Sequence, residues 1–143
     1  MIKIERLQKE DIPQLLELYK EIVPFENKVG DATKLYEEML QDDNYYLIAA
    51  KKGEELLGSI LGVCCKSLAS MGEPFLVIED VVVKENTRGM GIGKKLMGEA
   101  DKFAKEKNCN YAIIVSSDYR KSAHKFYEKV GFVDGVLGFR KLY

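Results

Sequence analysis

The chain has 143 residues, of which 46% are hydrophobic and 31% charged, a balance typical of one compact domain. Its 22 Lys and Arg residues nearly cancel its 23 Asp and Glu residues, so the net charge of -1 predicts neither a nucleic-acid partner nor a membrane partner. The three cysteines do not make a disulfide framework, and no stretch approaches the roughly 18 apolar residues of a membrane span. We therefore expect a single cytoplasmic domain over residues 1–143.

β-rich and amphipathic segments alternate along the first half of the chain, which predicts an α/β fold. Pro13 stands at the start of a helix whose apolar residues recur at helical spacing until Pro24 ends it. We expect Leu35, Met39 and Leu40 on the buried side of a second helix. The expected elements are a strand at 2–6, a helix at 12–23, a loop at 25–30, a helix at 33–42, and a hairpin of strands at 45–50 and 56–68.

The second half contains the strongest predicted strand, 75–83, whose β-favouring residues place apolar groups on both faces, as in a central strand. A glycine cluster and a helical pattern follow it. The further elements expected are a helix at about 92–104, a strand at 111–115, a helix at 123–130 that Gly131 ends, and two short strands within 132–143 that turn near Gly135 or Gly138.

The glycine cluster reads Arg88-Gly89-Met90-Gly91-Ile92-Gly93-Lys94 and lies between a strand and a helix. Glycines let a ligand approach the backbone closely, and the free amides of a helix N-terminus attract phosphate, so this turn is a candidate anion site. It does not match the P-loop, which would need glycine at Arg88 and Ser or Thr at Lys95. It also fails the dinucleotide pattern, which would need glycine at Lys94. The alternative is a strand-to-helix turn that holds no ligand.

Glu79 and Asp80 interrupt the apolar run of strand 75–83. Because a strand alternates its faces, we expect the two carboxylates to point to opposite sides, and burial would raise the pKa of at least one of them. A carboxylate of that kind can act as a general base near neutral pH. The alternative is that both make structural hydrogen bonds at a distortion of the strand.

Tyr127 lies on the apolar side of the last predicted helix, where it is either a core aromatic or a proton donor at the end of a pocket. His124 is the only histidine and is expected at the helix surface, and no nucleophile-elbow sequence is present. Cys64, Cys65 and Cys109 match no common zinc spacing. We therefore expect no metal site and interpret the thiols as apolar strand residues.

Two sequence motifs follow one another along the second half of this chain. The first is Glu79-Asp80-Val81-Val82-Val83 followed by the glycine cluster, and the second is Ala123-His124-Lys125-Phe126-Tyr127-Glu128-Lys129-Val130-Gly131-Phe132. Together they resemble the GNAT acetyltransferase superfamily, with its loop Arg/Gln-x-x-Gly-x-Gly/Ala and its segment Ala-x-x-Phe-Tyr-x-x-x-Gly-Phe. The resemblance covers nearly the whole chain and implies a single α/β (α+β) domain. Its sheet would be mixed and mostly antiparallel, with about six or seven strands and about four helices.

The resemblance implies acetyl-CoA as the acetyl donor and no metal. Main-chain groups of Val81 and Val83 would pair with the pantetheine arm, and the amides from Gly89 to Lys94 would hold the pyrophosphate. Many members have asparagine where this chain has Arg120, so that end of the donor would be held by a different contact or by Arg120 on a phosphate. The donor-binding residues implied are Val81, Val82, Val83, Arg88, Gly89, Met90, Gly91, Ile92, Gly93, Lys94 and Arg120.

The resemblance also implies two catalytic residues. Glu79 matches the residue that in many members deprotonates the acceptor amine, directly or through water, and Tyr127 matches the residue that protonates the departing thiolate. The chemistry requires the first role, because an alkylamine with a pKa near 10 must lose a proton before it can attack a thioester. A backbone amide near Val81 would stabilise the oxyanion.

These observations predict an N-acetyltransferase that moves an acetyl group to the primary amine of a small molecule, a peptide or a protein by direct attack on the thioester. The alternatives are a CoA-binding sensor or interaction module without turnover, and a nucleotide-binding domain of another kind. By resemblance, 25–30, 67–74 and 135–138 would shape the acceptor pocket. Glu26 and Glu73 would favour a cationic acceptor there or be ordinary solvated acids. A homodimer is compatible with the resemblance.

Overall fold

Five strands form one sheet covered by four helices in the part of the chain that the computed structural model describes, residues 1–116 and 121–143. The strands are β1 (Lys3–Arg6), β2 (Tyr45–Lys52), β3 (Glu55–Cys65), β4 (Phe75–Val83) and β5 (Ala112–Ile114). The helices are α1 (Ile12–Tyr19), α2 (Val29–Met39), α3 (Ile92–Glu106) and α4 (Lys121–Lys129). Short 3-10 turns at Lys9–Asp11 and Glu85–Thr87 precede α1 and follow β4.

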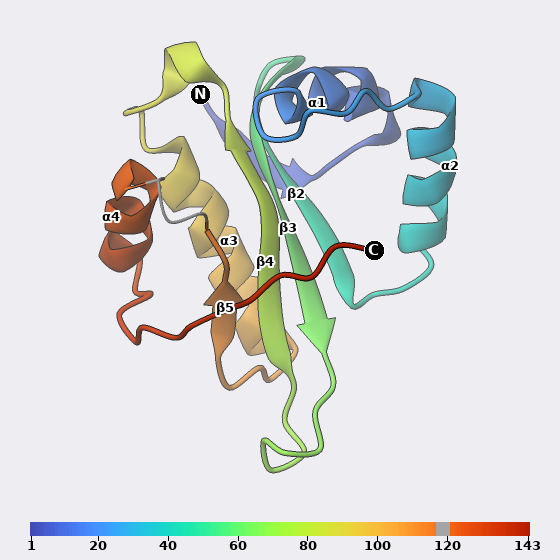
Figure 1. Ribbon diagram of the computed structural model, residues 1–143. Coiled ribbons are helices and arrows are strands. Elements are labelled where there is room, and N and C mark those ends of the chain that lie inside the picture. The colour runs from blue at the N-terminus through green and yellow to red at the C-terminus, as the bar shows by residue number, and fades with distance from the viewer. Residues whose placement is uncertain (117–120) are drawn as a thin grey trace.

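The strands lie in the order β1-β2-β3-β4-β5, with the first three pairs antiparallel and the pair β4–β5 parallel (Figure 1). A parallel pair needs a crossover connection, and α3 supplies it. The mixed, mostly antiparallel sheet is confirmed, but with five strands in the described residues instead of six or seven. The two short strands expected within 132–143 are absent, because past Val133 no backbone hydrogen bond joins this segment to any described strand.

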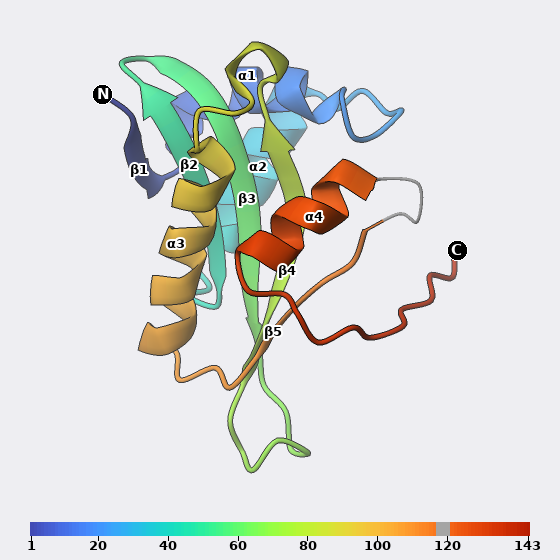
Figure 2. The ribbon, with the colours of Figure 1, turned by 90° about the vertical axis from the view of Figure 1, so that its left-hand side faces the viewer.

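Helices cover both faces of the sheet, with α1 and α2 on one face and α3 and α4 on the other (Figure 2). Under α3 the core is fully buried at Ile60 of β3 and at Leu96 and Ala100 of the helix. α1 ends at Tyr19, four residues before the end expected from the sequence, and the chain continues through turns. Among the described residues, no helix combines the length and the apolar character that a membrane crossing requires.

The buried side of α2 differs from the prediction. The helix begins at Val29 and buries Tyr36, whereas Leu35 and Leu40 are exposed. The phenol of Tyr36 donates a hydrogen bond of 2.6 Å to the carbonyl oxygen of Leu7, which satisfies its one polar atom inside the core. Tyr36, with its hydroxyl hydrogen-bonded, is therefore buried where the sequence pattern predicted Leu35.

One residue of β4 is extra in its pairing with β3. Between the pairs Leu61–Glu79 and Ser59–Val82, β3 advances by two residues and β4 by three, which defines a β-bulge. Asp80 adopts a φ of +53° at this point. The bulge shifts the alternation of the strand, so Val82 is buried on the α1 face, whereas the buried residues before the bulge face α3.

Candidate active site

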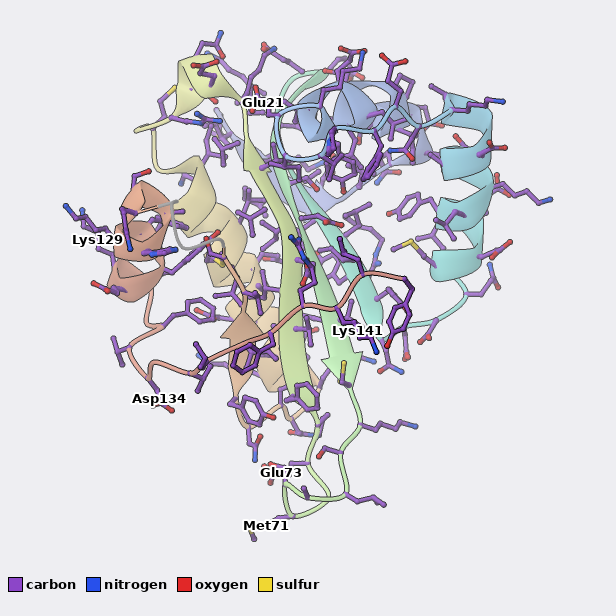
Figure 3. The ribbon with its side chains drawn as sticks, viewed as in Figure 1. Glu21, Met71, Glu73, Lys129, Asp134 and Lys141 are labelled. Carbon is purple, nitrogen blue, oxygen red and sulfur yellow. The ribbon has the colours of Figure 1, made fainter. Side chains whose placement is uncertain are left out.

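A cavity of about 1050 Å³ lies between the end of β4, the start of α3 and α4. Figure 3 labels one residue on each side of it, Glu21 from the segment after α1 and Lys129 from α4. The lining residues are Glu21, Ile22, 81–83 of β4, 87–89 of the following turn, 91–94 at the start of α3, and residues 121–123, 126, 127, 129 and 130 of α4 and its end. The cavity thus brings together both motifs of the sequence.

The cavity begins where β5 stops pairing with β4. The last pair of this ladder is Ile78–Ile114, and the bulge at Asp80 follows at once. Val82 and Val83 keep partners in β3, and none of residues 81–83 has a β5 partner in the described part of the chain. Their backbone groups on this side are therefore accessible to an extended ligand, in the way that a sheet edge accepts an added strand.

The N-terminus of α3 lies at the same cavity. Gly91 precedes the helix with a φ of 78° and a ψ of 13°, a left-handed conformation that a side chain would strain. No side chain caps this end of α3, and the N–H of Lys95 donates to the Gly91 carbonyl oxygen at 3.1 Å. The amides of residues 92–94 therefore precede the first helical hydrogen bond and are oriented to attract an anion.

Gly93 has a packing role beside any role toward a ligand. A Cβ atom at this position would lie 2.9 Å from Cζ of Phe126, closer than real side chains approach. The absence of a side chain at Gly93 thus lets α4 pack closely against the first turn of α3. Because Phe126 neighbours Tyr127, this contact sets where α4 presents its residues to the cavity.

Positive charge outweighs negative charge around the cavity, although the whole chain carries a net charge of -1. Arg88 has two contacts: its Nη2 atom lies 3.1 Å from Oε2 of Glu21, and its Nε atom donates to the carbonyl oxygen of Val83 at 3.3 Å. These contacts connect the loop before α3 to the segment after α1. The lining cations are Arg88, Lys94, Lys121 and Lys129, and the lining acid is Glu21.

Tyr127 is 7% exposed and lines the cavity. Its ring stands edge-on to Phe126, with 5.7 Å between centroids, and to Phe132, with 6.2 Å. The two alternatives for this residue therefore do not compete, because Tyr127 belongs to the core and also reaches the cavity wall. In the second sequence motif, Tyr127 directly follows Phe126 and precedes the turn at Gly131.

Glu79 and Asp80 lie at the bulge, immediately before the part of β4 that lines the cavity. Desolvation raises the pKa of Glu79, and the negative charge of Asp80 raises it further. Burial also raises the pKa of Asp80. Asp80 lies near Tyr19 of α1, since burial and then the Asp80 charge raise the pKa of that phenol. Both carboxyls are thus easier to protonate than ordinary surface acids.

The structure does not bring every predicted residue to the cavity. Met90 is 54% exposed and, like Glu79, is not part of the lining, and Arg120 lies outside the described residues. The loop that contains Glu73 lies at the other end of the sheet from Glu21 in Figure 3. Its residues, including the expected acceptor segment 67–74, are therefore distant from the cavity.

Some lining residues were not predicted from the sequence. Lys121 and Ser122 form the start of α4, and their position just before the second motif was the available signal. No local pattern indicated Glu21, because its partner Arg88 lies 67 residues further along the sequence.

The residues considered for other chemistry lie elsewhere. Cys64 is buried, and its sulfur lies 3.8 Å from that of Cys109, on the side of the sheet near the β3–β4 loop. His124 is partly buried on α4. Within residues 1–116 and 121–143, no group of three or more His, Cys, Asp or Glu side chains is placed to hold a metal ion.

Comparison with known proteins agrees with this geometry. Residues 12–132 match the model of the Acetyltransferase (GNAT) family, which is most of the chain, so the chain belongs to this family. A solved structure described as a putative acetyltransferase from Agrobacterium tumefaciens str. C58 superposes with a TM-score of 0.90 at 26% identity, over 99% of each chain. The predicted GNAT fold is thereby confirmed.

Two curated relatives are named as acetyltransferases of amines. Thialysine N-epsilon-acetyltransferase of Bos taurus is 26% identical over 147 residues, covering 93% of this chain and 85% of the relative. Glucosamine 6-phosphate N-acetyltransferase of Trypanosoma brucei brucei is 42% identical over 55 residues, covering 38% of this chain and 35% of the relative. The chain is an acetyl-CoA-dependent N-acetyltransferase, and a binding module without turnover is not supported.

Proposed function

We propose that this enzyme acetylates the primary amine of a small molecule by direct attack on the thioester of acetyl-CoA, with Glu79 and Tyr127 as its catalytic residues. The observation that carries the proposal is the shared cavity, which brings Tyr127 within one site with the open edge of β4 and the N-terminus of α3. The names of the relatives favour a small amine over a protein, since thialysine and glucosamine 6-phosphate are both small molecules.

The donor-binding residues proposed here fit the chemistry of acetyl-CoA. Residues 81–83 offer backbone hydrogen bonds to the amide-containing pantetheine arm, and the first amides of α3 with Lys94 offer donors to the pyrophosphate. Lys121 and Lys129 add positive charge on the α4 side, where a further phosphate would be held. A cavity volume of about 1050 Å³ is at the large end of the range of small-molecule sites, as a donor of the size of acetyl-CoA requires.

The two catalytic residues divide the proton transfers. Acetyl-CoA supplies an activated acyl group. Glu79 accepts a proton from the acceptor ammonium, directly or through water, so that the amine nitrogen can attack the carbonyl carbon. Tyr127 donates its phenol proton to the sulfur as the C–S bond breaks, which makes the thiol a better leaving group. The attacking nitrogen loses its second proton to solvent as the tetrahedral intermediate collapses to the amide. Exchange with solvent then returns Glu79 to its carboxylate form and Tyr127 to its phenol form. The raised pKa of Glu79 makes it a stronger base than an ordinary carboxylate.

The proposal is tested by acceptor-dependent release of CoA thiol with a panel of small primary amines. We expect Tyr127→Phe to lower kcat by about 100-fold, the usual contribution of a general acid, while Tyr45→Phe on β2 serves as a control that leaves kcat unchanged. Glu79→Gln should lower kcat/KM by a similar factor at neutral pH.

The pH profile distinguishes the role of Glu79 from a structural one. Because the ionised form is the base, kcat/KM of the wild type should rise with pH through a pKa above the ordinary range of glutamate. In Glu79→Gln this rise of kcat/KM should be absent, and only the rise at higher pH that deprotonation of the amine causes should remain. An unchanged limb in Glu79→Gln, or full activity of Tyr127→Phe, would remove these residues from the catalytic machinery.

A further inference from the structure

Two of the three cysteines are in contact at the end of the sheet from which the β3–β4 loop extends. The Cys109 thiol donates a hydrogen bond of 3.8 Å to the sulfur of Cys64. Cys64 lies near the end of β3, and Cys109 lies in the connection from α3 to β5. Figure 1 shows the end of β3 and the start of β5 at the same end of the sheet. The two residues are 45 positions apart in the sequence, so the fold creates this contact.

The backbone holds both thiols where they are. The N–H of Cys64 donates to the carbonyl oxygen of Asn44 at 2.8 Å, and the N–H of Cys109 donates to that of Ala104 at 2.8 Å. Asn108, with a φ of 60°, ends α3 directly before Cys109. A disulfide bond is about 2.05 Å long, so side-chain rotation has to close the remaining distance. Two groups held in contact in this way react with each other far faster than free groups do.

Cys64 is also within reach of a small molecule. Although it is 7% exposed, it lines a cavity of about 420 Å³ that Lys66 and Lys107 line as well. Burial, and then the hydrogen bond to Cys64, raise the pKa of the Cys109 thiol to about 11. Cys109 therefore keeps its proton at neutral pH and is the donor of the pair, whereas Cys64 is the acceptor and faces the cavity.

We propose that Cys64 and Cys109 form a modification site, a dithiol that a hydroperoxide oxidises to a reversible disulfide. The Cys64 thiol loses its proton to solvent, and its sulfur attacks one oxygen of the hydroperoxide. The O–O bond breaks, Cys64 becomes a sulfenic acid, and the other oxygen takes up a proton and leaves as an alcohol, or as water from hydrogen peroxide.

The second step closes the disulfide. The sulfur of Cys109 attacks the sulfur of Cys64, the S–O bond breaks, and the hydroxide leaves as water with the Cys109 proton. Over both steps the two thiols lose two electrons and two protons, and the hydroperoxide is reduced to an alcohol and water. A small thiol reductant reverses the change by thiol–disulfide exchange.

The third cysteine allows exposure to be separated from geometry. Cys65 ends β3, and the alternation of the strand turns its side chain to the other face of the sheet from that of Cys64. Its thiol donates to the carbonyl oxygen of Val63 at 3.8 Å. Cys65 is partly exposed and Cys64 is buried, so exposure alone would favour oxidation of Cys65. The contact between Cys64 and Cys109 predicts the opposite selectivity.

Peptide mapping of the full chain after treatment with hydrogen peroxide tests this site. After alkylation with iodoacetamide, the wild type should carry one alkylated thiol, at Cys65, and a peptide in which Cys64 is joined to Cys109. Dithiothreitol should return all three thiols. Cys65→Ser is the matched control and should form the same link. Cys109→Ser should form no link and should instead accumulate a sulfenic acid at Cys64 that dimedone traps.

Other patterns would overturn the proposal. Three alkylated thiols in the peroxide-treated wild type, or a link that involves Cys65, would show that the contact does not direct oxidation. If Cys109→Ser does not fold, Cys109→Ala takes its place, and the wild-type map still decides the matter.

Thermal unfolding adds a readout that does not depend on alkylation. A disulfide between these residues closes a long loop in the unfolded chain, so oxidation should raise the Tm of the wild type and of Cys65→Ser by about 5 °C or more. The same treatment should leave the Tm of Cys109→Ser without this rise. A Tm that falls when Cys64 and Cys109 are joined would overturn the proposal, because the link would then form only by distorting the fold.

Discussion

Asp80 is the residue at which β4 departs from a regular strand. Two acids within an apolar run were visible in the sequence, and they correctly marked a special place in the strand. The bulge itself could not be predicted, because it depends on how many residues of β3 pair with β4. The expected alternation of Glu79 and Asp80 assumes a regular strand, and the positive φ of Asp80 marks a departure from that regularity.

Asp80→Asn is expected to stabilise the protein in a pH-dependent way. Burial raises the pKa of Asp80, so ionisation opposes folding: the stability linked to this group is fully present below the unfolded pKa and is lost as pH rises through the folded pKa. The variant should thus melt at a higher temperature than the wild type at pH 8, and the gain should shrink toward pH 4.

The backbone conformation at position 80 does not confound this comparison, because aspartate and asparagine both tolerate a positive φ. Glu55→Gln on β3 is the matched control, because its salt bridge to Lys84 lowers the Glu55 pKa and its loss should destabilise the protein mainly at higher pH. If the melting temperatures of Asp80→Asn and the wild type differed by the same amount at pH 4 and at pH 8, the account of Asp80 would be contradicted.

At the scale of elements, the packing of α4 on α3 positions Tyr127, the proposed proton donor. The sequence predicted the glycine cluster as an anion site, and the conformation of Gly91 agrees with that interpretation. It did not reveal that Gly93 allows a close helix contact, because the partner Phe126 lies 33 residues further on. Contacts of this kind depend on tertiary structure that no local pattern encodes.

Substitution of two glycines in α3 by alanine should have opposite effects on stability. Gly93→Ala should destabilise the protein by about 1–3 kcal/mol, because its methyl group would overlap the ring of Phe126. Gly98→Ala lies in the same helix with no atom near its Cβ position, and it should stabilise the protein by about 0.5–1 kcal/mol through helix propensity. Chemical denaturation measures both. Equal stabilisation by the two substitutions would show that α4 does not pack closely at Gly93.

For the whole molecule, local patterns predicted the order and type of the elements. Periodicity found the five strands and four helices that the structure describes in residues 1–116 and 121–143, since these depend on nearby residues. It failed on the buried side of α2, where the hydrogen bond from Tyr36 to Leu7 decides which residue is buried. It also predicted strands within 132–143, where the β-favouring residues are present but the partner strand is not. Strand formation needs such a partner.

The site was predictable to the extent that it follows from two linear motifs. Those motifs located the open strand, the loop and Tyr127, and the cavity shows why they occur together: the bulge ends the β4–β5 ladder next to the N-terminus of α3. The charged residues that come from distant segments, such as Glu21, were not predictable. Neither was the separation of the 67–74 loop from the cavity, which follows from the length of β3 and β4.

The central claim is that this cavity binds acetyl-CoA, and thermal unfolding in the presence of separate ligands tests it most directly. A ligand at a hundredfold excess over its Kd stabilises the folded state by about 2.7 kcal/mol. At this chain length, each kcal/mol raises the Tm by about 2–4 °C. We predict a clear rise in Tm with acetyl-CoA and with CoA, and none with NAD. No shift with millimolar acetyl-CoA or CoA, or an equal shift with NAD, would contradict the account.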